Sequence, residues 1–248
     1  MTPYDGVSGD ALAARWGVPA CIVYERVSST LDVVHTMAAD GAPTGLVVLA
    51  DEQVAGRGRQ GRAWFSPPGS GVWLGYLARP GTGEIVRLLS IRVGLSVARG
   101  LERISVNLEL KWPNDLMLQN RKVGGVLCEA RWEATHPAWV AVGVGLNVRG
   151  PLPQALDLTA VALDAVRPGV TRLEVLDCIV PELCKLPSLP QLSGEELTAF
   201  ARRDWLNARQ LRGPVEGTAR GLAADGALLV ETDDGRVERV VGGSIVAR

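Results

Sequence analysis

The sequence has few of the residues that usually mark metal or disulfide chemistry. Its 248 residues include two histidines and four cysteines, and no two cysteines form a Cys-x-x-Cys pair. A zinc site is therefore not expected, and the thiols are expected to be reduced, as is usual in the cytoplasm. A chain of this length buries enough surface to fold without disulfides or a structural metal.

The chain also lacks a strong charge bias and a long apolar run. The formal net charge is −1, so a general attraction to nucleic acid or to an anionic membrane is not expected. The longest apolar stretch, 138–148, is shorter than the roughly 20 residues that cross a bilayer. The N-terminus has no basic segment followed by an apolar run, which argues against a signal peptide. We therefore expect a cytoplasmic protein.

Helix and strand patterns alternate over most of the chain. Helical spacing or capping signals cover residues 8–16, 31–39, 85–103, 172–183 and 193–203. Strand patterns cover residues 21–24, 45–50, 72–77, 106–111, 123–132 and 139–148. A turn at Gln119-Asn120 is expected to join the strands 106–111 and 123–132.

The pattern changes near Arg209 to short strands. Asp225-Gly226 and Asp233-Asp234-Gly235 are two hairpin signals within about ten residues of each other. Short strands at this spacing predict a small barrel. We therefore expect a boundary near residue 208, with one domain over 1–208 and another over 209–248.

The most unusual segment is Gly56-Arg-Gly-Arg-Gln-Gly-Arg62. Its glycines fit the Gly-x-Gly-x-x-Gly pattern of dinucleotide sites, but that pattern needs a following helix whose N-terminus holds the pyrophosphate. Pro67 and Pro68 forbid a normal helix there. A phosphate-binding loop is excluded too, because Arg62-Ala63 stands where that motif has Lys followed by Ser or Thr.

The same segment, called the Gly-Arg loop below, is suited to bind an anion. Its glycines let the backbone approach a ligand, and guanidinium groups bind phosphate and carboxylate through paired hydrogen bonds. Three arginines within six residues repel one another unless an anion neutralises them. We therefore expect unpaired arginines and a loop that stays mobile until ligand binds. From this segment alone, a solvated, disordered loop like those of RNA-binding tails is the alternative.

Three further clusters each contain two of these residue types: glycine, basic residues and asparagine. Lys111-Trp-Pro-Asn-Asp115 follows a predicted strand, and Arg121-Lys-Val-Gly-Gly125 enters the next one, where glycine often marks the close approach of a ligand. Gly143-Val-Gly-Leu-Asn147 ends an apolar strand. Taken singly, the first cluster is better explained as a surface turn, and the third is explained equally well as a turn capped by Asn147.

Together these segments resemble the bacterial biotin protein ligases. Ser29-Thr30, Gln53 with the Gly-Arg loop and Trp64, and the three later clusters occur in the order and spacing of that family. The resemblance runs from about residue 22 to the C-terminus and is weakest over 150–195. It implies an α+β fold: a class II synthetase-like catalytic domain with a mixed sheet flanked by helices, plus a small C-terminal SH3-like β-barrel.

The resemblance also implies an activity. The family consists of ATP-dependent ligases that form biotinyl-5′-AMP from biotin and ATP, and then transfer biotin to a specific lysine of a biotin carboxyl carrier protein domain of a carboxylase. ATP and Mg²⁺ are the implied co-substrate and metal, biotin is the substrate, and no tightly bound prosthetic group is expected. The implied assembly is a monomer or a homodimer.

The site residues that the resemblance implies fall into four groups. Biotin is expected to contact Ser29, Thr30, Gln53, Gly56, Arg57, Gly58, Arg59, Lys122, Gly125 and Leu127. ATP is expected to contact Arg59, Arg62, Trp64, Lys111, Asn114, Lys122 and Asn147. Catalytic roles are expected for Lys122, Arg59 and Asp115, and Mg²⁺ binding for Asp115 and Asn147.

These assignments agree with the chemistry of the side chains. The biotin carboxylate and the α-phosphate of ATP are both negative, so a fixed Lys122 ammonium between them relieves the repulsion. Asp115 is the candidate to orient or deprotonate the lysine of the carrier. Trp64 offers a face for adenine, and Ser29-Thr30 with Gln53 offer donors and acceptors for the ureido ring of biotin.

The chain departs from the family pattern at Leu31, where the family usually has Asn after Ser-Thr. Biotin affinity is expected to be weaker unless a neighbour supplies the lost hydrogen bond. Only 27 residues precede Ser28. This is too few for the N-terminal winged helix that some members use to repress biotin genes, so we expect the single-function type, without DNA as a partner.

Two other classes of protein remain as alternatives. A lipoyl or octanoyl ligase or transferase on a related fold binds an acyl chain, and is not expected to combine the Gly-Arg loop with Lys111-Trp-Pro-Asn-Asp115. A non-catalytic sensor of biotin or nucleotide would have lost the chemistry, but Lys122, Asn114 and Arg59 are intact.

Overall fold

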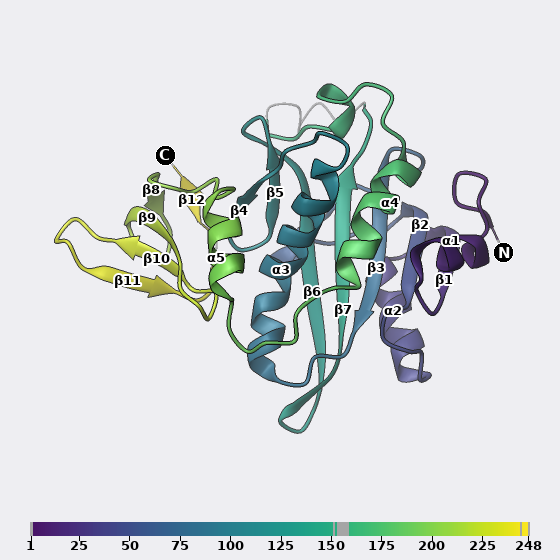
Figure 1. The fold of residues 1–248 in the computed structure, drawn as a ribbon, viewed down its shortest axis with the longest axis horizontal. Helices are drawn as coiled ribbons and strands as arrows, with labels where there is room; N and C mark the ends of the chain where they lie inside the picture. Colours follow the sequence, from purple (N-terminus) through teal and green to yellow (C-terminus); the bar gives the residue numbers. More distant parts are fainter. Residues whose placement is uncertain (1, 151, 153–158, 244, 248) are drawn as a thin grey trace.

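Two β-sheets organise the computed structural model, which describes residues 2–150, 152, 159–243 and 245–247. The larger sheet has seven strands in the order β1-β2-β3-β7-β6-β5-β4. The smaller sheet has five strands in the order β11-β10-β9-β8-β12 and lies beside the β4 end of the larger one (Figure 1).

The large sheet is mixed, as the family resemblance implies. Its strands are β1 (Cys21–Val27), β2 (Val47–Gln53), β3 (Gly71–Ala78), β4 (Glu109–Lys111), β5 (Asp115–Leu118), β6 (Arg121–Glu133) and β7 (His136–Asn147). β1 pairs with β2 in parallel, and all the other neighbours are antiparallel. β6 and β7 form a long hairpin at the centre of the molecule.

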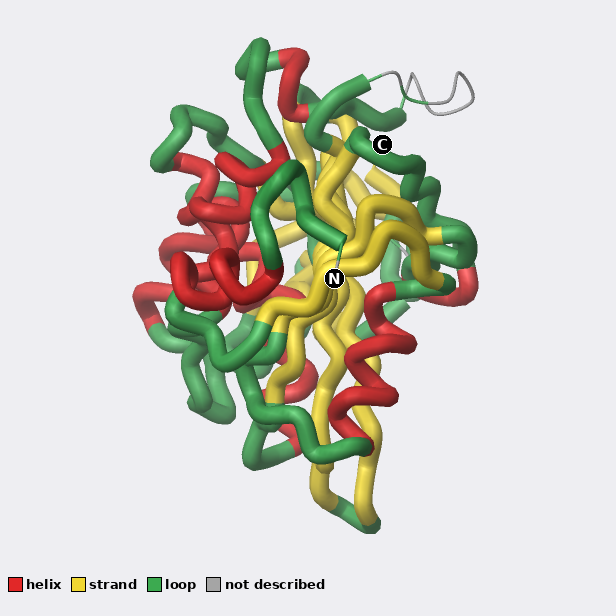
Figure 2. Tube along the Cα trace, turned by 90° about the vertical axis from the view of Figure 1, so that its right-hand side faces the viewer, coloured by secondary structure: helices red, strands yellow, loops and turns green. Residues whose placement is uncertain are grey.

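Helices cover both faces of this sheet. They are α1 (Gly9–Trp16), α2 (Thr30–Ala39), α3 (Gly83–Glu102), α4 (Arg172–Leu183) and α5 (Gly194–Ala201), with short 3-10 turns η1 (Arg59–Gly61) and η3 (Leu163–Ala165). In Figure 2 α2 lies on one side of the strands, and α1, α3 and α4 lie on the other. Within the described residues, no helix is long and apolar enough to span a bilayer.

Four of the five described helices begin within one residue of the predicted start, where hydroxyl side chains cap them; α3 begins two residues early and has no side-chain cap. Ser8, Ser29 and Thr171 each accept a hydrogen bond from a backbone N–H of the first turn. Ser193 and Glu196 form the predicted capping box, in which each side chain accepts from the other residue's backbone N–H.

The strand pattern around 106–118 is corrected by the structure. The sequence predicts one strand over 106–111, but β4 spans only Glu109–Lys111, and β5 was missed. Lys111 and Asp115 face each other across a tight turn that contains the cis Trp112-Pro113 peptide bond. Gln119 and Asn120, both with positive φ, therefore join β5 rather than β4 to β6.

The C-terminal sheet is antiparallel throughout. It comprises β8 (Gln210–Arg212), β9 (Gly217–Leu222), β10 (Leu228–Glu231), β11 (Val237–Val240) and β12 (Val246–Ala247). The two predicted hairpin signals lie between β9 and β10 and between β10 and β11. In the described part of the chain β11 and β12 do not pair, so the SH3-like unit is an open sheet rather than a closed barrel.

The small sheet is fixed to the large one through a tight contact at the hairpin between β9 and β10. The indole Nε1 of the buried Trp112 donates to the carbonyl of Gly226 at 2.9 Å. Gly226 has a φ of +83°, and a Cβ at this position would lie 2.8 Å from Leu88 on α3. Glycine is therefore required here both by the backbone conformation and by the closeness of α3.

Candidate active site

A cavity of about 550 Å³ collects the predicted site residues. Fifteen of the sixteen line it: Ser29, Thr30, Gln53, Arg57, Gly58, Arg59, Arg62, Trp64, Lys111, Asn114, Asp115, Lys122, Gly125, Leu127 and Asn147. The sixteenth, Gly56, lies directly behind the wall. A Cβ at Gly56 would lie 2.6 Å from the Trp64 carbonyl oxygen and 2.8 Å from Ser66 Oγ, so only glycine fits.

One end of the cavity is neutral and rich in hydrogen-bonding groups. The backbone N–H and the hydroxyl of Thr30 donate to Gln53 Oε1 at 2.9 and 3.2 Å, and Gln53 Nε2 donates to Ser66 Oγ at 2.9 Å. Ser29 caps α2 and is buried like Thr30. The carboxamide of Gln53 is thereby held in one orientation, as an exact polar recognition site requires.

The floor of this end is apolar because of Leu31. Its side chain is buried and packs onto β7, where a Cβ at Gly143 would lie 3.2 Å from it. Two residues further along β7, a Cβ at Gly145 would lie 2.7 Å from Trp64 Nε1. The glycines of β7 therefore make room for two large side chains of the protein itself, Leu31 and Trp64.

Lys122 lies where the neutral end meets the opposite, charged end. The register of β5 and β6 pairs Leu116 with Gly124 but Met117 with Lys122, so a bulge displaces the strand by one residue. The bulge places Lys122, which is three residues from Gly125, on the same cavity wall. A Cβ at Gly125 would lie only 3.5 Å from Lys122 Cε, so this glycine leaves room for the lysine.

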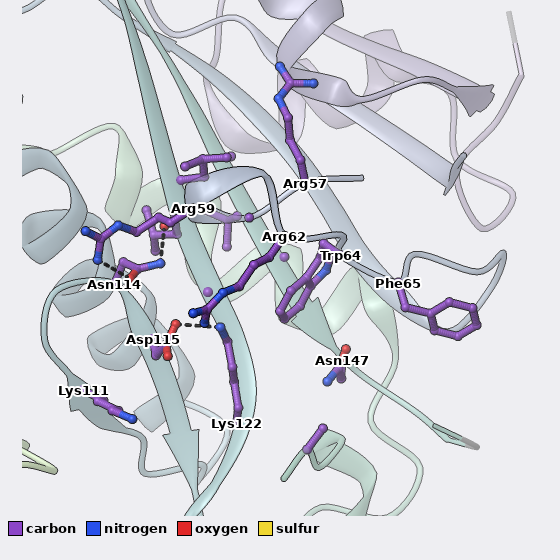
Figure 3. Close-up of a pocket in the computed structure, with 18 of the residues that line it drawn as sticks. Arg57, Arg59, Arg62, Trp64, Phe65, Lys111, Asn114, Asp115, Lys122 and Asn147 are labelled. Carbon is purple, nitrogen blue, oxygen red and sulfur yellow. Dashed lines mark hydrogen bonds and ion pairs between the residues drawn. The ribbon is translucent and has the colours of Figure 1, made fainter. Parts of the chain in front are cut away.

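The Lys122 ammonium has two partners. Its Nζ lies 2.6 Å from Asp115 Oδ1 and 5.2 Å from the centre of the Trp64 ring system (Figure 3). Its backbone is also pinned, because its N–H donates to the Thr159 carbonyl at 2.8 Å and its carbonyl accepts from Val161 at 3.0 Å. Lys122 is therefore a fixed positive charge in a partly buried wall.

The opposite end of the cavity is cationic. Arg59 donates to Asn114 Oδ1 at 3.3 Å and to the carbonyl of Gly243 at 3.4 Å, and burial lowers the pKa of Arg59 below its usual value. Lys111 Nζ lies 5.0 Å from the centre of the Trp205 ring, and burial lowers its pKa as well. Both cations lie in a poorly solvated wall, and the nearby Asp115 offsets only part of the effect of burial.

The charge balance of the cavity favours an anionic ligand. Arg62 is exposed and points into the same region in Figure 3. Among the described residues that line the cavity, Asp115 is the only acidic one, and it is already paired with Lys122. Guanidinium and ammonium groups without carboxylate partners at the rim of a pocket suit a phosphorylated ligand.

Arg57 corrects the expectation that the loop arginines are unpaired. Its guanidinium points away from the cavity (Figure 3). Nε and one terminal nitrogen donate to the two oxygens of Glu129 at 2.8 Å each, and Asp32 Oδ1 also lies 2.8 Å from the guanidinium. These bonds raise the pKa of Arg57 and lower that of Glu129. Arg57 is therefore neutralised by protein carboxylates, and charge repulsion from it does not keep the loop mobile.

The Gly-Arg loop forms a closed turn. Gly58 N–H donates to the Arg62 carbonyl at 2.7 Å, and Trp64 N–H donates to the Gly56 carbonyl at 2.8 Å. Only the 3-10 turn η1 follows Gly58, so the helix that a dinucleotide fingerprint requires is absent from this described segment. The rejection of that motif is confirmed.

Asn147 and Asp115 are two cavity residues that could offer side-chain oxygen ligands to a cation. Asn147 is buried at the end of β7, and its Nδ2 donates to the Val161 carbonyl at 3.2 Å, which fixes the amide. In the described residues, no cluster of three His, Cys, Asp or Glu side chains forms a metal cage. One carboxylate and one amide oxygen fit Mg²⁺ in its usual mode, in which phosphates and water supply the remaining ligands.

Several residues that line or support the cavity were not found from the sequence. They are Asp32, His35, Phe65, Ser66, Glu129, Trp205, Gly243 and Ile245. Gly243 and Ile245 belong to the C-terminal segment, far from the other residues in sequence. Phe65, half-exposed at the rim, follows Trp64 directly, and its position beside the Gly-Arg loop was the one available signal.

A pocket with a neutral hydrogen-bonding end, a cationic end and a fixed lysine between them defines an enzyme that activates a small acid with a nucleotide. Residues 23–147 match the model of the biotin/lipoate A/B protein ligase family, and residues 207–248 match that of the biotin protein ligase C-terminal domain. The chain belongs to the biotin protein ligase family.

Individual relatives agree with this assignment. The bifunctional ligase/repressor BirA of Bacillus subtilis is 31% identical over 229 residues, which cover 86% of this chain and 70% of that protein. The biotin–[acetyl-CoA-carboxylase] ligase of Paracoccus denitrificans is 33% identical over 225 residues, or 80% and 89% of the two chains. The biotin protein ligase of Aquifex aeolicus, solved in complex with biotin and ATP, superimposes with a TM-score of 0.76 at 26% identity, covering 92% and 98%.

Proposed function

We propose that this protein is an ATP-dependent ligase that forms biotinyl-5′-AMP from biotin and ATP, and then transfers biotin to a specific lysine of a biotin carboxyl carrier protein domain. The observation that carries the proposal is one cavity with a neutral polar end, a cationic end and Lys122 where they meet. The relative from Aquifex aeolicus, solved with biotin and ATP, supports the choice of the two ligands.

The neutral end binds biotin in this proposal. Ser29, Thr30 and Gln53 face the ureido ring, a neutral group that needs donors and acceptors at fixed positions. Leu31 and Leu127 supply the apolar surface for the rest of the molecule. Leu31 offers no hydrogen bond, so this end relies on the Gln53 carboxamide, which Thr30 and Ser66 already orient. Gly125 leaves room for the Lys122 side chain, and Gly56 lets the strand before the Gly-Arg loop pack closely against Trp64 and Ser66.

The cationic end binds ATP. Arg59, Arg62 and Lys111 pair with the phosphates, and Asn114 holds Arg59 in place. Trp64 offers a face for the adenine ring. The indole Nε1–H of Trp64 is buried and has no hydrogen-bond partner among the described residues, so it is an available donor in the cavity wall. Asn147, at the end of β7, lines the same cavity.

The first step joins the two ligands. A carboxylate oxygen of biotin forms a bond to the α-phosphorus of ATP, and pyrophosphate leaves with the electrons of the broken P–O bond. The Lys122 ammonium reduces the repulsion between the two anions and stabilises the charge that grows on the phosphate oxygens. Arg59, at the cationic end of the cavity, neutralises phosphate charge in the same way. Asp115 and Asn147 would hold Mg²⁺, which supplies further neutralisation of the phosphates.

The second step transfers the acyl group. The amine of the carrier lysine attacks the acyl carbon of biotinyl-5′-AMP, and AMP leaves as the amide forms. The amine must lose a proton, and Asp115 is the carboxylate in the cavity wall that can accept it.

The role of Asp115 is tested with pre-formed biotinyl-5′-AMP, which bypasses the first step. We expect Asp115→Asn to slow transfer to the carrier by about 100-fold, the typical contribution of one general base. Transfer at the wild-type rate would contradict this role.

The organisation of the protein is part of the same proposal. The chain divides into a catalytic domain, 1–208, and a C-terminal domain, 209–248, which is supported by β8 beginning at Gln210 and by the family match over 207–248. A cytoplasmic location is supported by four cysteines that form no disulfide. A monomer or homodimer that acts without DNA stays a prediction, and a gel-shift assay with a biotin operator tests the absence of DNA binding.

The proposed function is tested by covalent labelling of a carrier. The protein is incubated with ATP, Mg²⁺, a biotin carboxyl carrier domain and either labelled biotin or labelled lipoate. We expect label on the carrier with biotin only, because the Thr30–Gln53 end recognises a polar ring rather than a bare acyl chain. Labelling with lipoate instead would identify a lipoyl ligase. Binding of biotin without any labelling would identify a sensor.

A further inference from the structure

A chain of polar contacts lies behind the Gly-Arg loop, outside the cavity. The guanidinium of Arg57 is gripped by both oxygens of Glu129 at 2.8 Å. Glu129 Oε2 also lies 3.3 Å from His35 Nε2, and His35 Nδ1 lies 3.0 Å from Trp139 Nε1. This set, called the Arg57 anchor, joins the loop to β6, α2 and β7.

Each hydrogen bond of the Arg57 anchor has a defined donor and acceptor. An indole N–H can only donate, so His35 Nδ1 accepts from Trp139 and carries no proton. The proton of the neutral ring is then on Nε2, which donates to Glu129. Both carboxylate oxygens of Glu129 are therefore committed to the anchor, and its charge stays available to Arg57.

A second carboxylate, that of Asp32, also forms an ion pair with Arg57. Asp32, on the first turn of α2, lies 2.8 Å from the guanidinium and accepts from the Ser28 hydroxyl at 2.9 Å. Asp32 is nearly half-exposed, with 47% of its side chain accessible, whereas Glu129 is 30% accessible. Glu129 also binds Arg57 at two points, so it is the stronger partner.

The anchor is built on the strand that forms the wall of the site. Gly125, Leu127 and Glu129 alternate along β6, so they share one face, and the bulge adds Lys122 to it. The stem of Arg57 lines the cavity while its guanidinium points out. The loop that follows it closes on itself. Holding Arg57 therefore fixes the base of the loop against the biotin end.

We propose that Glu129 is a positioning residue that docks the Gly-Arg loop on β6 before substrate arrives, and that Arg57 is its anchor point rather than a ligand of the phosphates. The inference rests on the proposed function, because it concerns the biotin end of that site. A docked loop presents its glycine backbone to biotin without first having to be ordered. Lys122 and Arg59, which act in the chemical step, do not contact Glu129. Removing the Glu129 carboxylate is therefore expected to weaken the binding of biotin more than it slows the chemical step.

The test compares Glu129→Gln with Glu133→Gln, an exposed glutamate further along the same strand. Glutamine keeps the shape of the side chain and removes the charge that grips Arg57. Biotin-dependent exchange of pyrophosphate into ATP gives KM and kcat. We expect KM for biotin to rise about tenfold in Glu129→Gln, while kcat stays within about twofold of the wild-type value. A tenfold change in KM corresponds to the loss of one partly exposed, charge-assisted hydrogen-bonded pair. Glu133→Gln is expected to match the wild type.

Trypsin provides a second readout that needs no activity. In the absence of ligands, cleavage after Arg57, Arg59 and Arg62 is expected to be about tenfold faster in Glu129→Gln than in the wild type and in Glu133→Gln, because the loop opens more often. Arg57→Lys keeps a positive charge but loses the two-point grip, so its KM for biotin is expected to lie between those of the wild type and Glu129→Gln.

The outcomes separate the inference from the proposed function. An unchanged KM for biotin and unchanged cleavage in Glu129→Gln, with an active wild type, would overturn the inference. A loss in kcat with no change in KM would overturn it as well. If Glu129→Gln does not fold, Arg57→Lys takes its place, and a wild-type KM in that variant overturns the inference. A wild type without biotin-dependent exchange would overturn the proposed function instead.

Discussion

Lys122 is the residue on which the proposed chemistry depends most. Its ammonium is held by Asp115 at 2.6 Å and its backbone is pinned on both sides, so it needs no reorganisation during the reaction. We expect Lys122→Ala to lower biotin-dependent pyrophosphate exchange at least ~100-fold, the loss typical of one preorganised charge-stabilising group. Lys185→Ala, at an exposed lysine paired with Glu182, serves as the control. Near-normal exchange in Lys122→Ala would show that another group carries this role.

Asp204 gives a prediction for pH dependence. It lies between α5 and β8, and burial raises its pKa from 3.8 to about 6. Because the folded-state pKa is above the unfolded value, Asp204 favours folding at low pH, and this contribution is lost as the pH rises through 6. Relative to Asp204→Asn, the free energy of unfolding of the wild type is expected to fall by about 1 kcal/mol between pH 5 and pH 7.

Urea unfolding of both proteins at the two pH values measures this effect. Asparagine keeps an oxygen that accepts from the Leu206 N–H, as Asp204 does at 2.9 Å, so the comparison isolates the charge. A difference between the two proteins that does not change with pH would contradict the burial of an ionisable carboxyl at this position.

At the residue scale, the sequence predicts which residues line the cavity better than it predicts what they contact. Motif residues such as Asn114 and Asn147 are found because their spacing is fixed by tight turns and strand ends. Glu129 was missed because a single acidic residue in a strand carries no local signal. The pairing of Arg57 was missed for the same reason, since its partners are 25 and 72 residues away and are brought close only by the fold.

At the scale of elements, α3 depends on a buried arginine. Arg92 is 1% exposed, and it donates to Glu196 at 2.8 Å and to the carbonyls of Leu189 and Gln191 at 2.7 and 2.9 Å. These bonds tie the segment before α5 to α3. We expect Arg92→Ala to lower the free energy of unfolding by about 3–5 kcal/mol, because Glu196 is left buried without its partner.

Arg99 on the same helix is the matched control for Arg92. Its guanidinium lies 3.9 Å from Glu195, and half of its side chain is exposed. Arg99→Ala is therefore expected to change the free energy of unfolding by less than about 0.5 kcal/mol in chemical denaturation. Equal effects of the two substitutions would contradict the structural role of Arg92.

The elements that the sequence predicts well have strong local signals. The helices are marked by caps such as Ser29 and Ser193, and the long strands by apolar runs. β5 was missed because it has four residues and directly follows a proline turn. The bulge before Gly124 was also not predictable, since register depends on the partner strand, yet it places Lys122 on the wall of the site.

At the scale of the whole molecule, the cavity needs both sheets. The large sheet supplies the neutral end and Lys122, and the C-terminal segment closes the cationic end through Gly243 and Ile245. The contacts that hold this arrangement include those of Trp112 with Gly226 and of Arg59 with Gly243. The sequence predicts that a small β unit follows the large one. It does not predict that this unit contributes to the cavity, because that depends on how the two pack.

The central claim is that one cavity brings biotin and ATP together and forms an acyl-adenylate. The measurement that tests it most directly is the exchange of labelled pyrophosphate into ATP by the purified protein with Mg²⁺, in the presence and absence of biotin. We predict exchange that requires biotin and that lipoate does not support. Exchange without biotin, or no exchange with biotin and ATP both saturating, would contradict the claim.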